Sequence, residues 1–385
     1  MFLVIAITTV VLIVETYAWF VGTSTVSTNE FTITVTGAEG LELSLDGSTW
    51  YSGSNKLTIS QASITTGLSS SYSTNTNKWP TSGLVPLSSA GVLDTTNRRL
   101  ILFEKSILAA STGGYRLIST QFDNSSSEGD GYVAFDLFIK NGKGESYSGS
   151  YGATSAESIY LTKDSSTTFN GTDFGAANSV RIGFFIIGGV KTSGATVESI
   201  QNISCSMADT TTQKKVCPAY GADQKYYWNI WEPNYNVHTS NLVSYFNRVC
   251  KNRDTTTGDY TSDACSTISN TANKYTYAVY HEISSSDNVD IYDGQNGYTA
   301  TTTNAYSSTS TALLKLMITY IITSSTNYSD TNQLLKLAGN SISKVRIYIW
   351  LEGQDIDNYD LITGSQFDIN FGFTKDRYGI EESSD

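Results

Sequence analysis

The first 22 residues form an almost uninterrupted apolar run, MFLVIAITTVVLIVETYAWFVG, whose only charged side chain is Glu15. As an α-helix, a run of this length spans about 33 Å, close to the hydrocarbon thickness of a bilayer. Exposing an apolar helix of this length to water is unfavourable, so the segment needs lipid or other copies of itself around it. We therefore expect residues 1–22 to form a hydrophobic helix that is sheltered by a membrane or by a filament core.

Residues 1–22 could serve as an assembly helix or as a membrane anchor. No Lys or Arg precedes the apolar run, unlike a secretory signal peptide, so we expect the segment to be retained. A simple membrane anchor remains the alternative. Glu15 is costly among apolar side chains unless it lies near the interface, is protonated or is paired with another chain. The residues expected to make the assembly helix are Phe2, Leu3, Val4, Ile5, Ile7, Val10, Val11, Leu12, Ile13, Val14 and Glu15.

The rest of the chain is patterned for β-structure. Apolar and hydroxyl residues alternate at 31–35 and 41–45, and Asp46-Gly47 supplies a turn before residues 48–51, which predicts a hairpin. Further strands are predicted at 100–103, 132–140, 180–187, 275–280, 314–322, 345–351 and 367–373. The fold class is therefore mainly β, an N-terminal hydrophobic α-helix followed by a β-sandwich head of one elaborated or two sandwiches.

Two domains are expected after the helix boundary at residue 22. Residues 23–200 are predicted as a β-sandwich and residues 201–385 as a β-rich domain with disulfide-bearing loops; the alternative is one elaborated sandwich with an insertion at about 203–270. The turn-rich segments 141–155 and 284–304 are predicted as loops. Residues 238–251 have apolar residues near helical spacing and are the best candidate for a short helix.

The composition indicates an exterior protein rather than a nucleic-acid partner. The net charge is −12 with only 24 Lys and Arg, so a phosphate backbone would be repelled. Charged residues make up 16 % of the chain, below the globular norm of about 25 %, and Thr, Ser, Asn, Gly and Tyr replace them. A neutral polar surface of this kind is typical of extracellular β-proteins.

The four cysteines predict disulfides in an oxidising compartment. They are not arranged as CxxC pairs, which argues against a zinc site. Three pairings are open, and the pairing of the first with the second and the third with the fourth closes the shortest loops. Sequons for glycosylation occur at four positions. The cysteines are Cys205, Cys217, Cys250 and Cys265, and the sequons are at Asn124, Asn170, Asn202 and Asn327.

We predict no catalytic residues, no metal site and no cofactor. The chain holds two histidines, His238 and His281, and neither has a nucleophile motif or an HExxH continuation beside it. The acidic runs at 287–293 and 355–360 do not match the spacing of a calcium-binding loop, so solvated loops are the preferred interpretation.

An uncharged N-terminal helix placed directly before a β-rich head resembles type IV pilins and the related archaeal pilins. That resemblance implies that the helices are first held in a membrane and then bundle in the filament core. The chain departs from the bacterial pattern at Ile5, where a glutamate is common, and its helix is short.

A second resemblance covers TYAWF at 16–20 followed by TVSTNEF at 25–31. These residues are similar to the TYAxF box and first strand of camelysin-like and biofilm-fibre proteins of Gram-positive bacteria. The segments IWEPNYNVHT at 230–239 and VRIYIWLEGQDID at 345–357 resemble large secreted proteins with the same box. In the biofilm-fibre type the resemblance implies removal of the apolar run and assembly by strand exchange.

Together these features predict a pilin-like structural subunit of an extracellular, cell-surface filament. The subunit would be inserted in a membrane before assembly, form a homopolymer through residues 1–22, and expose a disulfide-bearing, glycosylated β-head for cell adhesion or biofilm support. Its expected partners are further copies of the chain and a surface receptor or glycan. The alternatives are a single-span membrane-anchored adhesin and a fibre protein that assembles by strand exchange.

Overall fold

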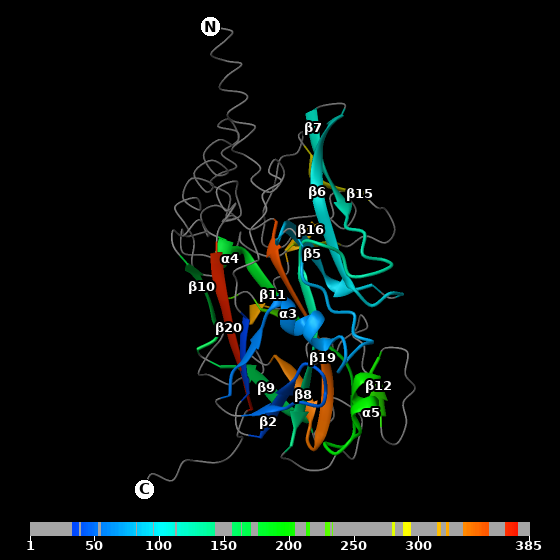
Figure 1. The fold of residues 1–385 in the computed structure, drawn as a ribbon. Helices are drawn as coiled ribbons and strands as arrows, with labels where there is room; N and C mark the ends of the chain where they lie inside the picture. Colours follow the sequence, from blue (N-terminus) through cyan, green and yellow to red (C-terminus); the bar gives the residue numbers. More distant parts are fainter. Residues whose placement is uncertain are drawn as a thin grey trace.

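The structure, a computed structural model, describes residues 33–37, 40–52, 55–81, 83–94, 96–111, 114–142, 156–162, 164–170, 176–204, 213–215, 228–231, 233, 279–281, 288–293, 314–316, 321–322, 334–353 and 366–375. These residues are mainly β-strands in largely antiparallel sheets, which confirms the predicted fold class at that level (Figure 1). The expected apolar helix at 1–22 lies outside them. Within the described ranges, no helix is long and apolar enough to cross a membrane.

The smaller sheet has six strands among the described residues. Its order is β18-β9-β20-β1-β4, with β10 also paired to β20. The first described strand, β1, runs parallel to the last described strand, β20, while the other described pairs of this sheet are antiparallel. The bounds are β1 Ile33–Gly37, β4 Leu57–Ile59, β9 Ala156–Leu161, β10 Ser166–Asn170, β18 Leu335–Ala338 and β20 Gln366–Lys375.

The larger sheet has twelve described strands. The main order is β15-β7-β6-β5-β19-β11-β13-β17; β8 pairs with β19 and β2, β3 with β2, and β12 with β11. The bounds are β2 Leu41–Ser44, β3 Tyr51–Ser52, β5 Pro86–Leu93, β6 Leu100–Ser111, β7 Gly114–Gln121, β8 Val133–Asn141, β11 Val180–Val190, β12 Gln213–Lys215, β13 Trp228–Trp231, β15 Asn288–Asp293, β17 Ile321–Ile322 and β19 Ser341–Glu352.

The remaining described elements are short. Strands β14 Val279–His281 and β16 Leu314–Leu316 pair with each other. The helical turns are α3 Gln61–Ile64, η1 Thr66–Leu68, α4 Ala176–Ser179 and α5 Val197–Gln201. Turn α3 begins at Ser60, whose hydroxyl accepts a hydrogen bond from the Ser63 N–H and so satisfies a donor at the helix start.

The two sheets share an apolar core. Phe184 of β11 in the large sheet meets Phe371 of β20 in the small sheet, edge to face, with ring centroids 5.5 Å apart. The same core contains Phe135 of β8 and Ile347 of β19, both fully buried. Figure 1 shows β20 and β19 in the two layers that enclose it.

The central strands of the large sheet are buried on both faces. Along β11, Phe184 faces the core between the sheets, whereas Phe185 belongs to a second apolar cluster with Tyr348 and Trp350 of β19. This is why β8, β11 and β19 are nearly continuous apolar runs rather than strict alternations. Gly183 is needed here, because a Cβ would lie 2.7 Å from the Phe185 ring.

The predicted hairpin near residue 46 is confirmed. Strand β2 pairs antiparallel with β3, and Gly47 has a φ of +73°, which favours glycine. The Asp46 carboxylate accepts hydrogen bonds from the Ser48 and Thr49 N–H groups at 2.8 Å each. The return strand begins at Tyr51, later than the turn dipeptide predicts, because these bonds extend the turn.

Most predicted strands are present, and one predicted loop is wrong. Strands β1, β2, β6, β8, β11, β14, β16, β17, β19 and β20 overlap the predicted runs. The loop at 284–304 contains β15, NVDIYD, which pairs with β7 although it includes one Asn and two Asp residues and lacks a regular apolar alternation. The predicted helix at 238–251 lies outside the described residues.

Strands from both expected domains share each sheet. Strands β19 and β20 follow residue 200, yet β19 pairs with β8 and β11, and β20 pairs with β1 and β9. Neither sheet is therefore confined to one side of the expected boundary. Residues near both ends of the chain must meet before either layer is complete.

Candidate functional site

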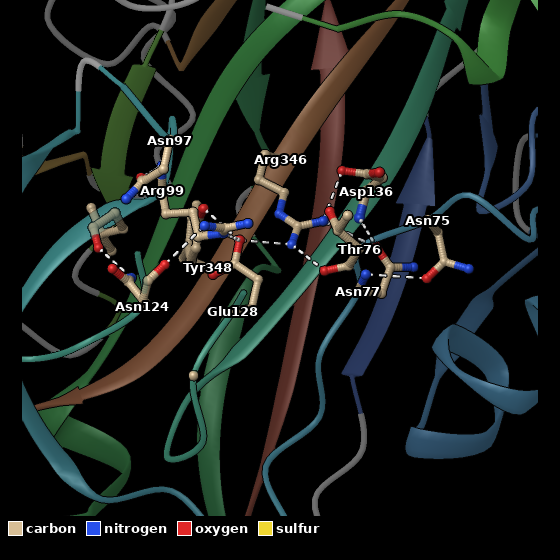
Figure 2. A network of polar contacts seen from close by, with 12 residues as sticks. Asn75, Thr76, Asn77, Asn97, Arg99, Asn124, Glu128, Asp136, Arg346 and Tyr348 are labelled. Carbon is tan, nitrogen blue, oxygen red and sulfur yellow. Dashed lines mark hydrogen bonds and ion pairs between the residues drawn. The ribbon is translucent and has the colours of Figure 1, made fainter. Parts of the chain in front are cut away.

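A buried ion-pair network lies on the outer face of the large sheet, away from the core that the two sheets share. Arg346 of β19 and Asp136 of β8 are direct cross-strand partners, and the Arg346 Nη1 donates to Asp136 Oδ1 at 3.0 Å. Its Nη2 donates to Glu128 Oε1 at 2.8 Å. Figure 2 shows Arg346 between the two carboxylates. One guanidinium thus joins a strand residue to the loop before β8.

The same guanidinium also binds the segment at residues 76–77. Arg346 donates to the Thr76 carbonyl at 2.7 Å and to the Asn77 side-chain oxygen at 3.2 Å. That Asn77 oxygen accepts a second bond from the Asp136 N–H at 2.9 Å. Residues 76–77 are therefore fastened to the sheet by side-chain rather than ladder hydrogen bonds.

A second branch runs from Asp136 to Tyr72. The Lys344 ammonium lies 3.1 Å from Asp136 Oδ2 and 2.7 Å from the Tyr72 hydroxyl, which itself donates to Asp136 Oδ2 at 2.9 Å. Lys344 also lies over the rings of Tyr72 and Phe138, at 5.4 and 5.8 Å from their centroids. These contacts add a cation–π interaction to the ion pair.

Two tyrosines complete the Glu128 end. The Tyr348 hydroxyl donates to Glu128 Oε1 at 3.0 Å and the Tyr132 hydroxyl donates to Oε2 at 2.6 Å. Arg99 lies at the margin of the network, with its Nε 4.0 Å from Glu128 and its Nη1 donating to the carbonyls of Asn124 and Ser125. Every oxygen of the Glu128 carboxylate is thus paired.

The network is almost completely removed from water. The side chains of Asp136, Glu128 and Arg346 are 3 %, 4 % and 5 % exposed. Charges at this depth are costly unless each is paired and hydrogen-bonded, and here each is. Asp136, Glu128 and Arg346 therefore form a rigid polar floor on the sheet. Replacing one of these residues by an apolar one would leave a buried charge without its partner.

Burial and neighbouring charges shift the pKa values of Asp136 and of two tyrosines in the network. Burial alone raises the pKa of Asp136, but Lys344 and Arg346 outweigh it and lower that pKa to about 2. Burial, followed by the negative charge of Asp136, raises the pKa of Tyr72 above its usual range. Burial and Glu128 likewise raise the pKa of Tyr348. Asp136 therefore remains an acceptor, and the tyrosines remain donors.

A pocket of about 700 Å³ opens beside this floor. Its described lining includes four cations and two carboxylates, a net charge of +2 for these residues, in a chain whose net charge is −12. The charged residues are Arg98, Arg99, Lys344, Arg346, Glu128 and Asp136, and the neutral ones are Tyr72, Thr74, Thr76, Thr96, Asn97, Ile187, Gln201, Asn202, Ile203 and Ser204.

The loop between β5 and β6 places two of the arginines. Asp94 Oδ1 accepts from the N–H groups of Thr96 and Asn97 at 2.7 and 2.8 Å, and the Asp94 N–H donates to the Arg99 carbonyl. The turn closes with Arg98 at a φ of +61°, a left-handed conformation that is uncommon for a residue with a side chain. Local hydrogen bonds therefore hold Arg98 at the pocket wall.

Only part of the predicted site falls on described residues. The assembly residues between Phe2 and Glu15, the four cysteines and Asn327 lie outside them. Asn170 ends β10, and Asn202 is exposed where α5 ends. Asn124 is 6 % exposed, and its amide nitrogen donates to the Leu100 carbonyl and the Tyr132 hydroxyl. That nitrogen is occupied, so Asn124 is unsuited to carry a glycan.

Sequence reasoning missed the pocket and its floor. The signal was present, since Asp136 interrupts the apolar run VAFDLFI and Arg346 interrupts VRIYIW. A charged side chain inside a strand that is buried on both faces requires a partner. The identity of that partner depends on the pairing of β8 with β19, which connects residues far apart in the chain.

Among the described residues, no group of three or more His, Cys, Asp or Glu side chains is placed to hold a metal ion. No family model, curated protein or solved structure matches this chain. The resemblances to pilins and to camelysin-like proteins therefore remain predictions.

Proposed function

We propose that the chain is a non-enzymatic structural subunit of an extracellular, pilus-like filament. In this proposal residues 1–22 form the buried assembly helix, and a β-sandwich head forms the exposed sheath for adhesion or biofilm support. The observation that carries it is the apolar run of residues 1–22, with Glu15 as its only charge, joined to a β-body by ten residues before β1.

The described body supports the proposal because it offers little apolar surface of its own. Its large apolar side chains are mostly enclosed, and within the described ranges only Phe169 and Val197 are strongly exposed, at 47 % and 40 %. A segment as apolar as residues 1–22 therefore needs lipid or further copies of itself. Each apolar side chain buried in a bundle contributes about 1.5–3 kcal/mol, enough in sum to hold subunits together after association costs.

Two environments follow one another in this proposal. Before assembly the helix lies in a membrane, where Tyr17 and Trp19 suit the interface. In the filament, the small residues Ala6, Thr8 and Thr9 allow close helix packing, and a neighbouring chain supplies a partner for Glu15. The head then faces an oxidising exterior in which its cysteines form disulfides.

A second mode of assembly, strand exchange, is favoured by the position of β1. This five-residue strand lies between β20 and β4 in the small sheet, and it follows directly on the N-terminal segment. A strand in that position contributes backbone hydrogen bonds on both sides, whichever chain supplies it. In this mode the sheet, rather than the apolar helix, would connect the subunits.

Deletion of residues 1–14 behind a conventional signal peptide separates the two modes. Surface material is sheared from cells and inspected by electron microscopy, and the secreted head is checked for native β-structure by circular dichroism. We expect a folded, secreted head and no filaments. Filaments of the deleted chain would establish strand exchange, and a wild-type chain found only as membrane-bound monomer would establish an anchored adhesin.

A matched pair of point variants tests the same idea without a deletion. Val10→Asp places a charge in the apolar run, and Val197→Asp places the same charge on an exposed position of the head. We expect Val10→Asp to abolish filaments and Val197→Asp to leave them intact. Equal filament yields from the two variants would contradict assembly through the helix.

A further inference from the structure

Among the described residues that line the pocket, one cation has no partner. Within the described chain, the side chains of Arg99, Lys344 and Arg346 bond to protein groups, whereas the Arg98 guanidinium makes no hydrogen bond or ion pair. Arg98 is half-buried and is held at the wall by the hydrogen bonds of the 94–99 loop. A guanidinium without a partner among the described residues, carried by a backbone that hydrogen bonds hold in place, is suited to bind a carboxylate through two parallel hydrogen bonds.

The rim of the pocket offers hydroxyl and amide groups. Thr74, Thr76 and Thr96 present hydroxyls, and Asn97 and Asn202 present amide nitrogens, that make no hydrogen bond to the described chain. Such groups both donate and accept, as sugar hydroxyls do. Among the described lining residues only two side chains are aliphatic, those of Ile187 and Ile203, so an apolar ligand would gain little from them.

The polar floor of the pocket is organised before a ligand binds. Its charges are paired before any ligand arrives, so binding requires no rearrangement of Arg346, Asp136 or Glu128. The excess of positive charge among the described lining residues attracts an anion to this pocket, although the chain as a whole is acidic. The volume of about 700 Å³ lies within the range of small-molecule sites.

We propose that this pocket binds a carboxylate-bearing saccharide. The carboxylate lies against Arg98, and the hydroxyls of the sugar exchange hydrogen bonds with the threonines and asparagines of the rim. This inference gives the exposed head of the proposed filament a ligand. It does not depend on polymerisation, because the pocket lies within one copy of the chain.

Three probes that differ in one group test the assignment. Full-length protein in non-ionic detergent is titrated with glucuronic acid, glucose and glucose 6-phosphate, and binding is followed by ligand-observed NMR. We expect saturable binding of glucuronic acid, with glucose at least roughly tenfold weaker, because the charge-assisted contact is missing. Equal binding of glucose, tighter binding of glucose 6-phosphate, or no saturation with glucuronic acid would overturn the proposal.

Two variants assign the binding to Arg98. Arg98→Asn removes the charge and keeps a residue that tolerates the left-handed backbone, and Lys56→Asn makes the same charge change at an exposed position outside the pocket. We expect Arg98→Asn to weaken glucuronic acid binding roughly tenfold and Lys56→Asn to leave it unchanged. Equal affinities of Arg98→Asn and the wild type would overturn the proposal.

A third variant guards against misfolding of the loop. Asn202→Asp introduces a negative charge at an exposed rim position, where folding is not at stake. It should weaken glucuronic acid binding more than glucose binding, because only the acid is repelled by the new charge; no change for glucuronic acid would count against the pocket. Filaments that bind no glucuronic acid would refute the ligand alone, and binding without filaments would refute polymerisation alone.

Discussion

Replacing Arg346 by Met tests whether the buried network stabilises the head. Arg346 is 5 % exposed and donates to Glu128, Asp136, Thr76 and Asn77. Met fills much of the same space but supplies no donor. The change therefore leaves two carboxylates in a site from which water is largely excluded.

The magnitude follows from the partners that remain. Removing one member of a buried ion pair costs about 3–5 kcal/mol. Asp136 keeps Lys344 and Tyr72, and Glu128 keeps the hydroxyls of two tyrosines, so neither carboxylate is left bare. We therefore expect a loss near the lower end, about 3 kcal/mol in the free energy of unfolding.

The assay is urea unfolding of the full-length chain in non-ionic detergent. Buried Trp350, four residues further along β19 on the same face, contributes to the tryptophan fluorescence that reports the transition. Lys140→Met is the matched control, because Lys140 pairs with Glu42 near the surface and such pairs contribute about 0–1 kcal/mol. If Arg346→Met costs no more than Lys140→Met, the network does not stabilise the head and the reasoning fails.

Three further changes test single contacts. The pKa of Asp136 falls from 3.8 to about 2 on folding, so the stability that its charge contributes is complete above about pH 4 and is lost as the pH falls toward 2. Asp136→Asn should therefore lack this dependence of the free energy of unfolding on pH, and an unchanged dependence in acid unfolding would contradict the lowered pKa. Gly131→Ala should cost at least about 1–2 kcal/mol in thermal unfolding, because φ is +101° and the new Cβ would lie 2.5 Å from Val85. Gly194→Ala is its control, because the new Cβ would lie 3.8 Å from the Thr192 Oγ1, an ordinary contact distance; similar losses for the two variants would contradict this reasoning. Tyr72→Phe should cost about 1–3 kcal/mol in urea unfolding, since the bonds of its hydroxyl to Asp136 and the neighbouring ammonium are lost, and a neutral result would count against that branch.

Local patterning predicted the strands that bury apolar side chains. The alternation at residues 41–45 and the apolar runs of β8, β11 and β19 identify strands because burial itself imposes these patterns. Strand β10, with the sequence STTFN, and the Asp-bearing strand β15 have no comparable apolar face. They are strands because β20 and β7 offer them backbone partners, and that is tertiary information.

The pocket could not be predicted from the sequence for the same reason. Arg346 and Asp136 are 210 residues apart and meet only because β19 lies beside β8. The parallel pairing of β1 with β20 is equally invisible from either strand alone. A charged residue within an apolar run predicts that some partner exists, but the sheet order decides which one.

The most direct test of the account is a helical reconstruction by electron cryomicroscopy of filaments sheared from the cell surface. The account predicts a central bundle of helices built from residues 1–22, with the β-heads outside and each β1 paired to β20 of its own chain. Filaments without a helical core, in which β1 of one subunit completes the small sheet of the next, would contradict it.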